Sequence, residues 1–138
     1  MSEAAARPLP MLSHVHLGVN DFAAAFAFYA PLLEVLGLQL KFRDDARGWA
    51  GWMAPDAPRP LLLIGRAFDG HPASAGNGQM LALQAASRAQ VDRCHALALA
   101  HGARCEGAPG LRPHYHPDYY GAYFRDLDGN KLCVCSHG

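Results

Sequence analysis

The segment MLSHVHLGVN, residues 11–20, decides the fold of this chain, because its side chains alternate in character along its length. A period of two is typical of a strand with one face in a core and the other face open. The core face carries Val15, Leu17 and Val19, and the open face carries His14, His16 and Gly18. We therefore expect a strand over 11–20 whose histidines point away from the core.

A helix is expected directly after this strand. Asp21 can cap its first turn, an apolar stripe at helical spacing follows, and Gly37 suits its end. Three strand-like runs separated by turn residues come next, over 38–43, 48–53 and 61–66. Residues 11–66 therefore predict a βαβββ module.

The same order begins again after residues 67–78, a stretch rich in glycine, alanine, serine and proline that we interpret as a linker. A strand over 79–85 precedes Ser87, which is spaced to form a capping box with Gln90. The helix that starts there is expected to end at Gly102. The second half therefore repeats the first in order.

The spacing of the two halves also agrees. His14 precedes the cap Asp21 by seven residues, and Met80 precedes the cap Ser87 by seven. Strands over 103–106, 118–126 and 131–135 complete the second module, residues 79–137. We expect a single α+β domain over residues 1–138, in which the two βαβββ modules form a cupped mixed sheet with the helices on its outside.

Composition narrows the choice of partners and location. Twelve Lys and Arg side chains balance twelve Asp and Glu, which argues against a nucleic-acid-binding protein. No apolar run is long enough for a membrane span or a signal peptide, so we expect a cytoplasmic protein without a membrane partner. The four cysteines are expected to be reduced thiols.

Several motifs, taken in order, resemble a known family. They are Ser13-His14-Val15, Asn20-Asp21-Phe22, Phe28-Tyr29, Leu36-Gly37-Leu38 and the turn Asp126-Leu127-Asp128-Gly129-Asn130. Together with the repeat they resemble the vicinal-oxygen-chelate superfamily of glyoxalases, bleomycin-resistance proteins and dioxygenases. The stretch 110–117 resembles a glyoxalase-like subgroup in particular.

This resemblance implies a cup that holds a divalent metal, with ligands on the first and last strands of the modules. His14 stands at the first ligand position, whereas Met80 stands where a histidine is expected and Cys133 where a glutamate is expected. Two interpretations follow. His14, Met80 and Cys133 could form a soft site for zinc or copper(I), or Met80 and Cys133 fill a cup that holds no metal. We favour the second interpretation, because random substitutions are enough to lose a metal site, whereas a remade site also needs the right geometry.

Other side chains are candidates for ligand binding. The loop and strand over 112–125 concentrate groups that could hold a planar or anionic molecule, namely Arg112, His114, His116, Tyr120, Tyr123 and Arg125. His16 lies beside His14 on the first strand. Trp49 and Trp52 are three places apart on a strand, so only one of them can face the cup.

Three functions remain open at this stage. The first is a glyoxalase-like protein that binds a small organic molecule in the cup, with lyase or isomerase activity if His14 or His116 acts as a general acid or base. The second is a metal-free binding or sequestering protein, similar to the drug-resistance members of the family, which act as homodimers. The third is a metal-dependent lyase or dioxygenase with unusual ligands.

Overall fold

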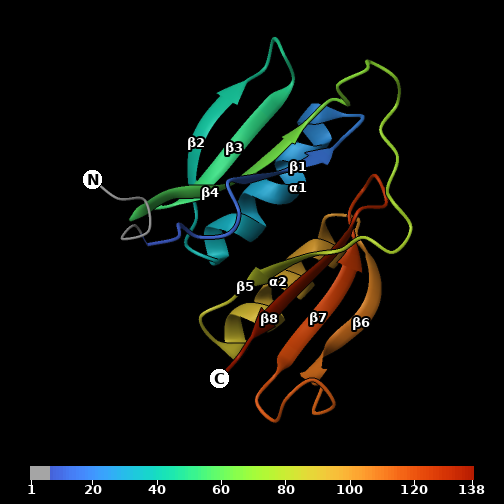
Figure 1. Cartoon of the computed structure of the whole chain (residues 1–138). Coiled ribbons are helices and arrows are strands. Elements are labelled where there is room, and N and C mark those ends of the chain that lie inside the picture. The colour runs from blue at the N-terminus through green and yellow to red at the C-terminus, as the bar shows by residue number, and fades with distance from the viewer. Residues whose placement is uncertain (1–6) are drawn as a thin grey trace.

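A computed structural model describes residues 7–138 of the chain (Figure 1). The first module contains β1 (His14–Gly18), α1 (Phe22–Val35), β2 (Gln39–Asp44), β3 (Trp49–Ala54) and β4 (Ala57–Gly65). The second contains β5 (Leu81–Gln84), α2 (Arg88–Ala100), β6 (Arg104–Leu111), β7 (Tyr120–Arg125) and β8 (Lys131–Ser136). The predicted order of elements is confirmed.

The strands form two mixed sheets of four, in the orders β1-β4-β3-β2 and β5-β8-β7-β6. In each sheet the first strand pairs in parallel with the last strand of its module, and the remaining pairs are antiparallel. β1 and β5 are therefore equivalent edge strands. The predicted α+β fold of two βαβββ modules is confirmed, with each module forming its own sheet.

Both helices start at the residues expected from their caps. The side chain of Asp21 accepts a hydrogen bond from the amide of Ala24 at 3.1 Å. Ser87 accepts one from the amide of Gln90 at 3.2 Å, and the Gln90 side chain accepts from the amide of Ala86. These bonds satisfy amide groups that a helix start otherwise leaves unpaired.

A single apolar core joins the two modules. α1 packs on the first sheet, α2 packs on the second, and the helices contact each other. The Sγ of Cys94 in α2 lies 3.7 Å from the carbonyl oxygen of Leu32 in α1. The strands contribute Ala50, Trp52, Leu62, Ile64, Ala122, Phe124, Leu132 and Val134 to this core. Because the buried residues form one cluster, we expect the modules to unfold together.

Polar side chains join the C-terminal end of β1 to the turn before β8. The Asn20 amide pairs with the backbone of Ala73 in both directions, at 2.7 and 3.1 Å, and also donates to Asp128. Asn130 donates to the carbonyl oxygen of Gly18 at 3.0 Å.

Residues 67–78 contain no helix or strand, and Figure 1 shows them looping from the first sheet round to β5.

The strand boundaries differ most from prediction at β1, β4 and β6. β1 is shorter than the expected 11–20, because its pairing with β4 runs only from His14 to Gly18. β4 begins at Ala57, where a short hairpin pairs it with Ala54. β6 extends to Leu111, although glycines and a proline hide its alternation, and its register with β7 shifts twice.

No helix of the described residues is long and apolar enough to cross a membrane.

Candidate functional site

The open face of the first sheet carries the two histidines of β1. His14 lies opposite Leu61 and His16 opposite Leu63 in the parallel pairing with β4. A β-carbon on Gly65 would lie 3.0 Å from the Nε2 of His16 and 3.0 Å from the Cβ of Trp49, so these side chains share one face. Both histidines are exposed. The alternation of the first strand therefore placed them correctly.

Although His16 is exposed, partial removal of its ring from water is the main cause that lowers its pKa, and the nearby His14 lowers it further. The imidazole of His16 is therefore neutral at neutral pH. The Nδ1 of His14 lies 2.9 Å from the hydroxyl of Ser13.

Trp49 and Trp52 face opposite ways, as predicted. Trp49 packs edge-on against Phe42 on the open face, with ring centroids 4.6 Å apart. Trp52 is 3% exposed and stacks on Phe26 of α1 at 5.5 Å.

The open face of the second sheet is covered by its own loop. The hydroxyl of Tyr119 lies 2.9 Å from that of Tyr123 and 3.3 Å from the Sγ of Cys133. Gly121 makes this possible, because a β-carbon there would lie 2.8 Å from the Tyr119 ring. The loop is also held by His116, whose Nε2 lies 2.8 Å from the Nδ1 of His137. This face is therefore filled by protein side chains.

The three residues at the metal-ligand positions do not fit a metal ion. Burial raises the pKa of Cys133 to about 11, so its thiol stays protonated, whereas metal binding requires the thiolate. The hydroxyl of Tyr119 also lies within hydrogen-bonding distance of the Cys133 sulfur. His14 and Met80 are exposed, and among residues 7–138 no three His, Cys, Asp or Glu side chains gather as a metal site requires. We derive no chemistry through a metal.

The remaining candidates from the second module do not converge on one place. Tyr120 lies on the helix side, where its hydroxyl donates to Asp92 of α2 at 2.6 Å. Arg125 is paired with Glu106 at 2.6 Å, and Arg112 donates to the carbonyl oxygen of Ala108 in β6. His114 packs against Tyr115 at the surface. Side chains along β7 alternate between the two faces of the second sheet, so candidates that are close in sequence point to different faces.

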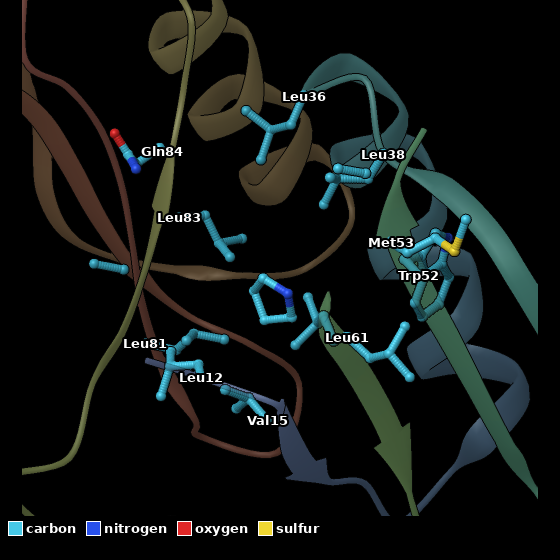
Figure 2. Close-up of a pocket in the computed structure, with 14 residues that line it drawn as sticks. Leu12, Val15, Leu36, Leu38, Trp52, Met53, Leu61, Leu81, Leu83 and Gln84 are labelled. Atoms are coloured by element: carbon cyan, nitrogen blue, oxygen red, sulfur yellow. The ribbon is translucent and has the colours of Figure 1, made fainter. Parts of the chain in front are cut away.

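A groove between the two modules does not coincide with the predicted cup, although three predicted site residues line it. Its first compartment measures about 330 Å³ and lies between β5 on one side and β3 and β4 on the other. In Figure 2, Leu81 and Leu83 project toward Leu61 and Trp52, while the Gln84 side chain lies on the far side of β5. The compartment is lined mainly by Leu12, Val15, Leu36, Leu38, Trp52, Leu61, Leu81 and Leu83. We call it the apolar compartment.

A second compartment of about 260 Å³ adjoins the first, and Val15 and Leu81 line both. It is polar where the first is apolar. Its polar side chains are His16, Gln79, Asn130 and Lys131, and Met80 lies among them. We call it the polar compartment, and we call the two together the inter-module groove.

Sequence patterns carried no signal for this groove. Leu61, Leu81 and Leu83 have the alternation of ordinary core residues, and only the separation of the two sheet edges leaves space beside them. Trp52, predicted as a ligand contact, does line the groove. His16 and Met80 line its polar end.

The paired βαβββ modules, each with a helix on one face of its sheet, define a class of α+β proteins built by internal repetition. The chain belongs to the Glyoxalase/Bleomycin resistance protein/Dioxygenase superfamily, whose family model matches residues 11–134.

Solved structures agree with this assignment. A glyoxalase/bleomycin resistance protein from Albidiferax ferrireducens T118 is 36% identical, with a TM-score of 0.81, over 92% of this chain and 99% of that chain. A glyoxalase-related enzyme from Fulvimarina pelagi is 19% identical, with a TM-score of 0.68, over 93% of this chain and 88% of that one. The second similarity concerns the fold alone. No curated protein sequence matches the chain.

Proposed function

We propose that this protein binds a small organic molecule in the inter-module groove and needs no metal ion to do so. The apolar compartment is the observation that carries the proposal. Its volume of about 330 Å³ falls within the range of small-molecule sites, and its lining is mainly apolar. A ligand that enters it transfers apolar surface out of water, which is the main source of affinity in such sites.

The contacts between the two modules keep the groove open. β1 and β5 are edge strands of different sheets and do not pair with each other. The modules are held instead by the contact of α1 with α2 and by the hydrogen bonds of Asn20 and Asn130. Because these contacts lie beside the groove, the leucines on its two walls cannot close on one another without disturbing them.

Binding can be tested with N-phenyl-1-naphthylamine, a neutral dye whose fluorescence rises in apolar surroundings. We expect Leu83→Gln to weaken dye binding roughly five- to thirtyfold, equivalent to ~1–2 kcal/mol of lost apolar contact. Leu40→Gln is the matched control, because Leu40 is a 48% exposed strand leucine outside the groove. Equal affinity in the two variants, or no binding to the wild-type protein, would reject the proposal.

Three sequence predictions remain for experiment. Turnover by His14 or His116 would appear as product formation from a ligand that raises the melting temperature of the protein, whereas a ligand of a sequestering protein raises the melting temperature without forming product. A homodimer is a second prediction, and light scattering after size exclusion measures it directly. A cytoplasmic location is the third, and cell fractionation tests it.

A further inference from the structure

We infer that the ligand of the inter-module groove is an amphipathic organic anion, with a hydrocarbon body in the apolar compartment and a carboxylate-type head in the polar compartment. This inference rests on the proposed function and adds the chemical class of the ligand. Val15 and Leu81 line both compartments, so the two are neighbours, and we place the hydrocarbon body of the ligand in one and its head in the other.

The charges along the groove select the head group. Lys131 is the one fully charged side chain among the residues that line the two compartments, and no aspartate or glutamate is among them. A cationic head would therefore leave water to meet a positive charge, whereas an anionic head would be attracted by it. The compartment favours a carboxylate over an amine for this reason.

Lys131 is not neutralised by its neighbours. Glu106 interacts only weakly with the charge of Lys131, because its carboxylate is paired with Arg125 at 2.6 Å. Asp126 and Asp128, in the turn before β8, accept hydrogen bonds from Tyr29 and Asn20. Within the described residues Lys131 makes no salt bridge, and its ammonium lies 5.8 Å from the centre of the Tyr123 ring. Its positive charge is therefore available to a ligand.

Two other polar side chains of the compartment have unused hydrogen-bonding capacity. Neither His16 nor Gln79 makes a side-chain hydrogen bond in the part of the chain that the structure describes. The Gln79 side chain lies over Gly76, where any β-carbon would collide with it, so it is held at the rim of the compartment. Both can donate to a carboxylate oxygen, since an amide always carries donors and a neutral imidazole carries one.

The experiment compares three ligands with the same hydrocarbon chain, namely decanoate, decanol and decylamine. Each displaces N-phenyl-1-naphthylamine at a concentration below that at which it forms micelles. We expect decanoate to bind at least tenfold more tightly than decylamine and more tightly than decanol. Lys131→Met should remove the advantage of decanoate over decanol and leave decanol binding unchanged.

The control is Lys41→Met, because Lys41 is the other lysine of the chain and lies exposed on β2, outside the groove. It should keep the preference for decanoate. Equal binding of decanoate and decanol to the wild-type protein would overturn this inference while the proposed function stands. A preference for decanoate that survives in Lys131→Met would also overturn it. Failure of all three ligands and the dye to bind would reject the proposed function itself.

Discussion

The hydroxyl of Tyr29 in α1 donates a 2.5 Å hydrogen bond to the Oδ2 of Asp126, in the turn before β8. The two residues belong to different modules, and both are buried. The other carboxylate oxygen of Asp126 accepts from the amides of Asp128 and Asn130, so the same side chain shapes the turn and joins the modules. Burial, followed by the charge of Asp126, raises the pKa of Tyr29.

Removing this hydroxyl should destabilise the fold. We expect Tyr29→Phe to lower the free energy of unfolding in urea by ~1–3 kcal/mol, because a buried hydrogen bond to a charged group is lost. Tyr120→Phe is the matched control, since its hydroxyl donates to Asp92 at the protein surface, and it should cost less than ~1 kcal/mol. An equal loss of unfolding free energy in the two variants would show that the Tyr29 hydrogen bond does not stabilise the contact between the modules.

Ligand binding should be visible through one tryptophan and not the other. Trp52 lines the apolar compartment, whereas Trp49 lies on the open face against Phe42. Decanol should therefore change the emission of Trp49→Phe, in which Trp52 remains, and leave the emission of Trp52→Phe unchanged. A response only in Trp52→Phe would place the ligand on the open face instead.

The four thiols should differ sharply in reactivity. Cys105 is exposed, whereas Cys94, Cys133 and Cys135 are buried, and burial raises the pKa of Cys94 and Cys133 to about 11. Since the thiolate is the reactive form, we expect Ellman's reagent to modify one thiol rapidly in the folded protein and all four after unfolding. Cys105→Ser should abolish the rapid phase, and a rapid phase that persists would contradict the assignment.

Acid should weaken the fold through His16 and His95. Burial lowers the pKa of both His16 and His95 below their ordinary value of about 6.5. As pH falls below that value the unfolded chain binds protons that the folded chain does not, so the free energy of unfolding falls with pH. His95→Gln should lose less stability than the wild type between pH 8 and pH 5. An identical loss in both proteins would exclude His95 as a cause.

Metal analysis tests the interpretation of the ligand positions. Because Cys133 is held as a thiol beneath Tyr119, we expect the purified protein to carry far less than one transition metal ion per chain. Added zinc should leave the melting temperature unchanged. One ion per chain, released by His14→Ala, would instead support a metal-dependent function.

Much of the fold could be predicted because its signals are local. The alternation around His14 and the caps at Asp21 and Ser87 each depend on a few neighbouring residues, and the structure has the strand and both helices there. The full length of β6 cannot be predicted, because its glycines let the strand bulge without an alternating pattern. The sequence predicts Tyr120 as a ligand contact, but alternation along β7 turns it toward α2.

By itself, the sequence determined the two repeated modules, their order and the direction in which the β1 histidines point. Each of these follows from periodicity and capping over a short span. The place where a ligand can bind follows instead from how the two modules pack together. Leu61, Leu81 and Leu83 have the sequence character of core residues, and they border a groove because the packing of α1 against α2 holds β1 and β5 apart. That distance depends on contacts between residues far apart in the chain, which no local pattern encodes.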